Sequence, residues 1–141
     1  MALAEKSIGE LGELRFCANA LERGIVVCTP FGDNCAYDAI TEYNGVTKRV
    51  QIKASGKRDM SKRNADSTEY WGFTITKGRE GKIDYNADDF DVLVAYIIPL
   101  NITFIIPSGD LFANVTRKLS LNLLAESKWA GYNEAWEHLR M

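Results

Sequence analysis

Apolar residues recur at spacings of three and four near the start of the chain: Leu11, Leu14, Ala18 and Leu21. This period is that of one face of an α-helix. Gly24 follows and can end a helix in the left-handed conformation. We therefore predict a helix over residues 7–23 with these residues as its apolar stripe.

The pattern then changes to short runs rich in β-forming residues, at 25–28, 36–43 and 48–55. The last two runs flank Asn44-Gly45. Both positions of a type I′ turn need positive φ, which Asn and Gly tolerate, so this dipeptide predicts a β-hairpin. Further strands are predicted at residues 70–76, 91–98 and 102–106, and a last helix at 133–139, where Tyr132, Trp136 and Leu139 form a stripe.

Residues 56–69 have no apolar periodicity and are predicted to form an exposed, mobile loop. Asp88, Asp89 and Asp91 precede an apolar strand and are assigned to a turn or helix cap rather than to a metal site. With 141 residues, the chain has the length of one domain, residues 1–141. The order of elements predicts an α/β fold in which the first helix packs on a mixed sheet that contains the hairpin.

The Asn44-Gly45 turn also predicts which side chains meet. If these two residues form the loop, Tyr43 pairs with Val46, and Asp38 then lies opposite Gln51. Because side chains alternate along a strand, Lys53 projects to the same face as Gln51 and lies diagonally across from Asp38.

A carboxylate, an amide oxygen and an ammonium group gathered at a strand end suit phosphodiester hydrolysis. Oxygen ligands hold a hard divalent cation such as Mg²⁺, which activates water, and a lysine stabilises the negative charge of the transition state. The first helix can add Glu13 or Glu10, of which we prefer Glu13. Two unit charges about 5 Å apart at an effective dielectric of about 20 repel by roughly 3 kcal/mol, so Glu13 beside Asp38 would require a cation.

A simpler interpretation of the same spacing stays open. Asp38 and Lys53 would then be a plain cross-strand ion pair, worth about 0.2 to 1 kcal/mol, on a half-exposed sheet. Glu10 and Glu13 would be solvated residues at the edge of an amphipathic helix.

The order of Gly9 and Glu13, a helix, Gly24, then Tyr37-Asp38 and the run Val50-Gln51-Ile52-Lys53 resembles the PD-(D/E)XK nuclease superfamily. The likeness is greatest to a small branch with a VQxK strand motif, which includes a cyanobacterial group I intron homing endonuclease. Archaeal Holliday junction resolvases share the early Glu, the hairpin Asp and an E-x-K strand.

The resemblance implies a restriction-endonuclease-like core and a Mg²⁺-dependent endodeoxyribonuclease, with Mn²⁺ able to substitute. It implies that Asp38 and Gln51 bind metal, that Glu13 completes the metal shell, and that Lys53 assists the nucleophilic water. One departure is that Gln51 stands where the family motif has an acidic residue. An amide oxygen can coordinate a cation but carries no charge.

Charge is unevenly distributed along the chain. Residues 48–82 contain ten Lys or Arg and four Asp or Glu, whereas both flanking segments are acidic. Basic side chains of this middle segment are candidates for gripping DNA phosphates: Lys57, Arg58, Lys62, Arg63, Lys77, Arg79 and Lys82. The alternative is that they belong to a solvated loop.

The start of the chain has no secretory signal pattern, so we expect a cytoplasmic protein with no membrane contact. A duplex has two strands and the chain offers one site, which predicts a homodimer or homotetramer. We expect an endonuclease that acts on duplex DNA in the manner of a homing or restriction enzyme. The alternatives are a Holliday junction resolvase and a non-catalytic DNA-binding module with a vestigial site.

Overall fold

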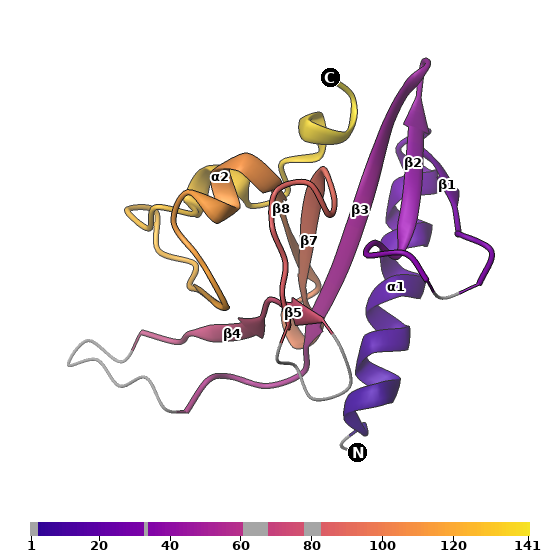
Figure 1. The fold of residues 1–141 in the computed structure, drawn as a ribbon. Helices are drawn as coiled ribbons and strands as arrows, with labels where there is room; N and C mark the ends of the chain where they lie inside the picture. The colour runs from indigo at the N-terminus through magenta and orange to yellow at the C-terminus, as the bar shows by residue number, and fades with distance from the viewer. Residues whose placement is uncertain (1–2, 33, 61–67, 78–82) are drawn as a thin grey trace.

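The computed structural model describes residues 3–32, 34–60, 68–77 and 83–141 (Figure 1). Its first half contains α1 (Glu5–Glu22), β1 (Val26–Cys28), β2 (Ala39–Tyr43), β3 (Val46–Ser55), β4 (Trp71–Thr74), β5 (Thr76–Lys77) and β6 (Ile83–Asp84). Its second half contains β7 (Val92–Ile97), η1 (Ile98–Leu100), β8 (Ile102–Pro107), α2 (Ser108–Phe112), β9 (Lys118–Leu121), η2 (Ala130–Tyr132) and η3 (Trp136–Leu139). Of the predicted loop at 56–69, residues 61–67 lie outside the described residues.

Five strands form one mixed sheet in the order β1-β2-β3-β7-β8. β3 and β7 run parallel, and the other neighbours in this sheet are antiparallel. The predicted mixed sheet and α/β class are therefore confirmed. Two small sheets accompany it, one of β4 and β9 and one of β5 and β6.

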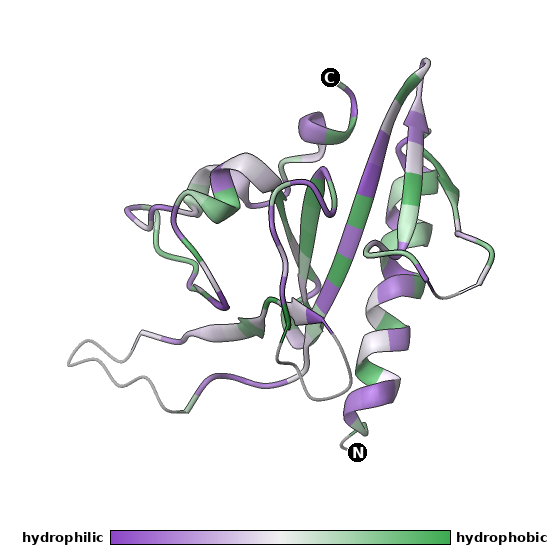
Figure 2. Ribbon diagram, viewed as in Figure 1, coloured by the Kyte–Doolittle hydropathy of each residue, from purple (hydrophilic) through white to green (hydrophobic). Residues whose placement is uncertain are grey.

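Each face of the main sheet buries its own apolar cluster. On one face Val50 and Ile52 of β3 pack with α1 and with the chain's last turn, η3. On the other face Leu93 and Ala95 of β7 pack with β4, β9 and α2. Figure 1 shows α1 beside β1, β2 and β3, and α2 beside β8. β7 is buried along its whole length and apolar throughout, as expected for a central strand covered on both faces, whereas β3 alternates polar and apolar residues (Figure 2).

The helix predicted at 7–23 is confirmed, but its predicted apolar stripe is wrong. The residues of α1 buried against the sheet are Gly12, Phe16 and Ala20, whereas Leu14 and Leu21 are 68% and 62% exposed. Small residues at 12 and 20 let the helix approach the strand closely, and Phe16 fills the space between them by stacking on Trp136 at 5.7 Å. The close approach of α1 to β3 therefore decides which face of the helix is buried. Among the described residues no helix is long and apolar enough to cross a membrane.

The helix predicted at 133–139 is also wrong, because only the single 3-10 turn η3 forms there. Glu134 has a positive φ of 53°, and its backbone N–H donates to the carbonyl of Thr103 at 2.7 Å. Its carboxylate accepts hydrogen bonds from Thr103 N and Trp136 Nε1. These bonds attach the segment to β8 and replace the first hydrogen bonds of a helix. Trp136 and Leu139 are nevertheless buried, so their apolar pattern correctly indicated core residues.

The predicted hairpin register is confirmed along the ladder. Asn44 and Gly45 both have positive φ, 49° and 84°. The pairs run from Tyr43 opposite Val46 to Ala39 opposite Val50. β2 begins at Ala39 rather than at residue 36, so Asp38 lies one position beyond the last pair of the ladder.

The close contact between α1 and β3 generates a stability prediction. A Cβ added at Gly12 would lie 2.7 Å from the Cβ of Ala54, so helix and strand must separate to admit it. We expect Gly12→Ala to lower the free energy of unfolding by about 1–3 kcal/mol in chemical denaturation, although alanine favours helices.

The matched control is Gly9→Ala on the same helix, where an added Cβ meets no atom within 4 Å. That substitution should raise the free energy of unfolding by up to about 1 kcal/mol. Adding Ala54→Gly to Gly12→Ala should restore part of the loss, since it removes the opposing Cβ. Stabilisation by Gly12→Ala equal to that by Gly9→Ala would contradict the packing described.

Candidate active site

The candidate site lies where β3 extends past the end of β2. Beyond Ala39, no β2 residue pairs with β3, so the backbone of Ile52 faces an open edge of the sheet. Asp38 closes part of this edge. Its N–H donates to the carbonyl of Val50 at 2.8 Å, and its carboxylate Oδ2 accepts a hydrogen bond from the N–H of Ile52 at 2.9 Å.

Asp38 therefore meets β3 differently from the simple cross-strand pair predicted with Gln51. The chain leaves the ladder at this residue, and the carboxylate turns into the plane of the sheet toward Ile52 N. The reason is that an N–H at an open strand edge needs a partner, and a side-chain oxygen can take the place of the missing strand.

Gln51 and Lys53 share one face of β3, as predicted. They pair with Leu93 and Ala95 of β7, whose side chains belong to the cluster under β4, β9 and α2. Gln51 is only 6% exposed, and its Nε2 makes one long contact of 3.5 Å to the carbonyl of Ile52. The half-buried Lys53 donates from Nζ to the carbonyl of Thr76 at 3.3 Å.

Asp38 and Lys53 are electrostatically coupled. Burial raises the pKa of the Asp38 carboxyl, and the hydrogen bond from Ile52 and the charge of Lys53 oppose that rise. Burial lowers the pKa of the Lys53 ammonium, and Asp38 opposes that fall. Each group is thus shifted toward its neutral form, because their attraction only partly offsets the loss of water. A plain surface ion pair would not show this balance.

Glu13 of α1 reaches the same place from the helix side. Although the residue is exposed in surface area, partial burial of its carboxyl group raises its pKa, and repulsion from Asp38 and from Glu10 raises it further. The structure therefore brings Asp38 within electrostatic reach of both Glu13 and Lys53. A divalent cation between the two carboxylates would relieve their repulsion.

Lys77, Tyr85 and Asp89 complete the surroundings, and of these the sequence did not point to Tyr85. The Tyr85 ring centroid lies 5.7 Å from Lys53 Nζ and 5.5 Å from Lys77 Nζ. Lys77 forms an ion pair with Asp89 at 3.2 Å. Burial, followed by the charges of Asp38 and Asp89, raises the pKa of Tyr85 to about 12. Lys77 was predicted only as a DNA contact, and no local motif distinguishes Tyr85 from the other tyrosines.

The aspartates near Tyr85 form a turn, as predicted. Asn86 N donates to Asp89 Oδ2 at 2.8 Å, and Asp88 N donates to Asn86 Oδ1 at 2.9 Å. Asp91 instead accepts from the backbone and the guanidinium of Arg49, which holds the pKa of Asp91 below its usual range despite partial burial. None of these carboxylates points to a separate metal site.

The donors at the open edge fit a hard divalent cation. They are the carboxylates of Asp38 and Glu13, both with raised pKa values. Gln51 lies on the same strand, and its amide nitrogen contacts the carbonyl of Ile52. The N–H and the carbonyl of one strand residue point to the same side of the strand. Because the N–H of Ile52 faces Asp38, the carbonyl of Ile52 also faces this open edge. The described residues contain no group of three or more His, Cys, Asp or Glu side chains suited to a metal ion. A cation here would therefore depend on neutral oxygen ligands and water as well.

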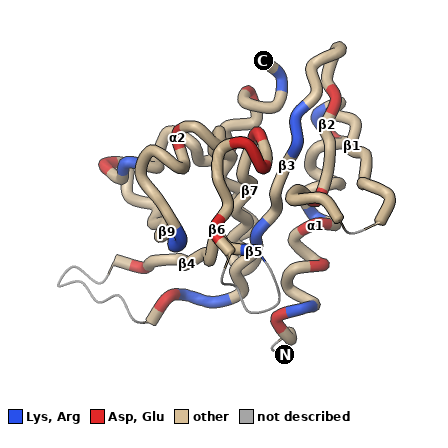
Figure 3. The backbone as a smooth tube through the Cα atoms, viewed as in Figure 1, with Lys and Arg blue, Asp and Glu red and all other residues tan. Residues whose placement is uncertain are grey.

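The predicted phosphate contacts are only partly described. Lys62, Arg63, Arg79 and Lys82 lie outside the described residues. Lys57 follows β3 and is exposed, Arg58 pairs with Glu69 at 2.9 Å, and Lys77 pairs with Asp89. Figure 3 shows basic and acidic positions interspersed after β3. Arg58 and Lys77 are therefore paired with carboxylates of the protein, whereas Lys57 forms no ion pair among the described residues.

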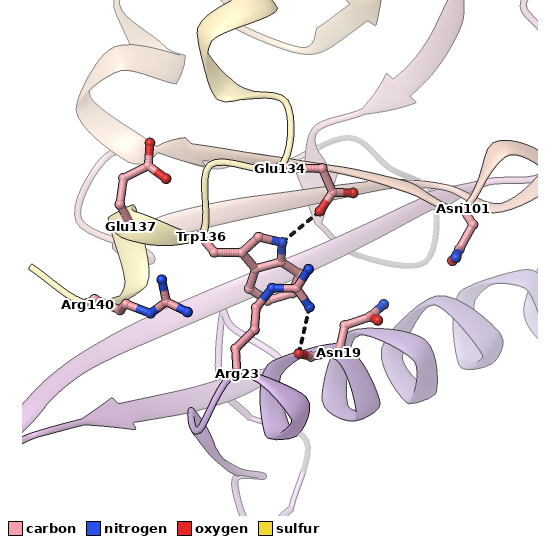
Figure 4. Close-up of a pocket in the computed structure, with 7 residues that line it drawn as sticks. All are labelled: Asn19, Arg23, Asn101, Glu134, Trp136, Glu137 and Arg140. Atoms are coloured by element: carbon pink, nitrogen blue, oxygen red, sulfur yellow. Dashed lines mark hydrogen bonds between the residues drawn. The ribbon is translucent and has the colours of Figure 1, made fainter.

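A polar pocket of about 440 Å³ lies elsewhere, beside the end of α1 (Figure 4). It is lined by Asn19, Arg23, Asn101, Glu134, Trp136, Glu137 and Arg140. The Arg23 guanidinium stacks over the Trp136 ring at 4.3 Å. None of the predicted site residues lines this pocket, so it is not part of the candidate active site.

Comparison with known proteins identifies the fold and the family of this chain. The structure of a bacterial homing endonuclease, I-Ssp6803I, is similar to this chain, with a TM-score of 0.74 and 26% sequence identity. The match covers 96% of this chain and 91% of that one. No curated protein matches the chain.

A family model described as PD-(D/E)XK endonuclease matches residues 3–139, almost the whole chain. The mixed sheet with its flanking helices is accordingly a restriction-endonuclease-like fold. The chain belongs to the PD-(D/E)XK endonuclease family.

Proposed function

We propose that the protein is a metal-dependent endonuclease that hydrolyses phosphodiester bonds of duplex DNA, using Mg²⁺ or, in its place, Mn²⁺. The observation that carries the proposal is the Asp38 carboxylate, held by Ile52 N at the open edge of β3 and interacting electrostatically with both Glu13 and Lys53, in a member of an endonuclease family. The similar bacterial protein is a homing endonuclease, which favours a homing or restriction-like role here.

The protein's own residues divide the work of hydrolysis. Asp38, Glu13 and the Gln51 amide oxygen would hold the cation, which when bound activates water and neutralises phosphate charge. Ile52 N fixes the orientation of Asp38 by its hydrogen bond. Lys53 presents a partly desolvated ammonium to the same edge, where positive charge stabilises the pentacovalent transition state and a lowered pKa eases proton exchange with water.

DNA binding would exchange partners among the basic residues around the site. Arg58 and Lys77 pair with carboxylates on the protein, and only the Arg58–Glu69 pair is exposed, at 51% and 52% of the two side chains. Exposed pairs contribute little stability. A DNA phosphate could therefore replace Glu69 beside Arg58 at small cost. Lys57 needs no such exchange, because it forms no ion pair among the described residues.

Replacing Lys53 tests the enzymatic assignment. We expect Lys53→Ala to reduce the single-turnover rate of Mg²⁺-dependent DNA cleavage by about 10²–10³-fold, because it removes a positive charge beside the reacting phosphate. Fold and DNA affinity should persist, as measured by circular dichroism and a binding titration. Lys48→Ala, on the same strand but before the open edge, is the matched control and should cleave at nearly the wild-type rate.

The substrates for this test should span the alternatives. They are supercoiled plasmid, a library of random-sequence linear duplexes, nicked duplex and a four-way junction, each with Mg²⁺ and with Mn²⁺. Preference for the junction would favour the resolvase alternative. A wild-type protein that binds DNA but cleaves none of these substrates would overturn the proposed activity and favour the vestigial site, which the neutral Gln51 already brings into consideration.

Replacing Asp38 tests whether its ionised carboxylate destabilises the metal-free protein and binds the cation. Its folded-state pKa is raised, so the free energy of unfolding should fall as pH rises from the ordinary carboxyl pKa through the raised one. Without metal at neutral pH, we expect Asp38→Asn to be at least as stable as wild type, because the amide still accepts from Ile52 N. The stabilisation of wild type by added Mg²⁺ should be absent in the variant.

Denaturant titrations in EDTA and in Mg²⁺ across a pH series measure both effects. Asp88→Asn, in the exposed turn, is the control and should leave the metal response unchanged. A metal-free Asp38→Asn that is clearly less stable than wild type at neutral pH would show that the carboxylate is a structural residue in the folded protein.

A single site per chain favours an assembly for cutting both strands, and we propose a homodimer or homotetramer. Light scattering of the protein, alone and with duplex DNA, should give a mass of at least two chains under one of these conditions. A monomer under both conditions would contradict the proposal.

A further inference from the structure

The Lys53 ammonium has few partners to hold it in place. Its side chain has a flexible four-carbon stem, and its one hydrogen bond within the described residues is the 3.3 Å contact to the carbonyl of Thr76. The Tyr85 ring, 5.7 Å away from centroid to Nζ, is the other group that contacts it. This distance lies within the range over which an ammonium is attracted to the face of an aromatic ring.

Tyr85 itself is firmly placed. It follows β6 immediately and is 9% exposed. Its ring packs edge-on against the fully buried Phe90, with centroids 5.3 Å apart. The core thus fixes the ring, and the ring can fix a mobile side chain lying against it.

A second lysine uses the same ring. Lys77 Nζ lies 5.5 Å from the ring centroid and is anchored by Asp89 at 3.2 Å. Two ammonium groups near one another repel, so each needs its own compensation. Asp89 supplies it for Lys77, Asp38 supplies it for Lys53, and the ring lies in contact with both lysines.

We propose that Tyr85 is a positioning residue whose ring holds the Lys53 ammonium beside Asp38 at the open edge of β3. The inference rests on the proposed nuclease function for its catalytic consequence, but the contact itself does not. The ring carries the role, since among the described residues the Tyr85 hydroxyl makes no hydrogen bond. Phenylalanine should therefore replace tyrosine, and an aliphatic residue should not.

The first test compares Tyr85→Leu with Tyr85→Phe in single-turnover DNA cleavage at saturating DNA. Tyr85→Leu should cleave at least tenfold more slowly, because a reacting group displaced by about 1 Å can lose up to 10²-fold in rate. The DNA concentration that gives half the maximal rate should stay within twofold of wild type. Tyr85→Phe should restore the rate to within threefold of wild type.

Phe73→Leu is the matched control, since it removes another buried ring of the same cluster that makes no ring contact with Tyr85 and, among the described residues, lies against no lysine ammonium. All rates are compared at a temperature where each variant is folded. Equal slowing by Phe73→Leu and Tyr85→Leu would assign Tyr85 a general packing role and overturn the inference. So would full activity of Tyr85→Leu.

A second test keeps the shape of the ring and changes only its charge distribution. Phenylalanine analogues with increasing fluorination, placed at position 85, draw electron density from the ring face and weaken its attraction for an ammonium. The cleavage rate should fall stepwise along the series while the melting temperature stays level. A rate independent of fluorination would overturn the inference.

A measurement without DNA separates this inference from the proposed activity. The Lys53 ε-methylene protons should show an upfield ring-current shift in NMR spectra of wild type and Tyr85→Phe, lost in Tyr85→Leu. Absence of that shift in wild type overturns the positioning contact, whatever the protein cleaves. A normal shift in a protein that cleaves no DNA overturns the nuclease function and leaves the contact established.

Discussion

The hydrogen bond from Ile52 N to the Asp38 carboxylate is the interaction on which the site depends. It arises because β3 is longer than β2, so part of β3 faces no neighbouring strand on that side. An unpaired strand edge needs a partner, and Asp38 supplies an oxygen in the plane of the sheet. From that plane the carboxylate reaches both layers: Glu13 on the helix side and Lys53 on the opposite side. A side chain held on either face alone would couple to only one of them.

A second constraint fixes which residues of β7 lie beside Gln51 and Lys53. Arg49 donates from its backbone N–H and its guanidinium to Asp91, and Asp91 N donates back to the carbonyl of Arg49. This reciprocal contact lies just before the first pair of the parallel β3–β7 ladder and sets its register. Apolar side chains of β7 then lie beside the polar residues of β3, so the lysine stem is buried while its head group reaches the edge. The lowered pKa of Lys53 follows from that burial.

How much the sequence could predict depends on how local each determinant is. The hairpin and its register follow from Asn44-Gly45, because two adjacent residues dictate the turn. The packed face of α1 does not follow from leucine spacing, because close approach to Ala54 demands a small residue at position 12 and outweighs the burial of Leu14. Tyr85 was missed for a similar reason. Its contact with Lys53 depends on how the β5–β6 hairpin packs over β3, and no pattern along the chain records that packing.

The neutral Gln51 fits the electrostatics of the folded protein. Asp38 and Glu13 already have raised pKa values. A third carboxylate at position 51, where the side chain is almost fully buried, would add repulsion and a further desolvation penalty that only a bound cation could offset. An amide would offer an oxygen to a cation without that charge, so that a weaker hold on metal would be accompanied by a more stable metal-free fold. The departure from the family's acidic motif therefore suits a site with few compensating cations, in which Lys53, on the positioning role proposed for Tyr85, would be the principal source of positive charge.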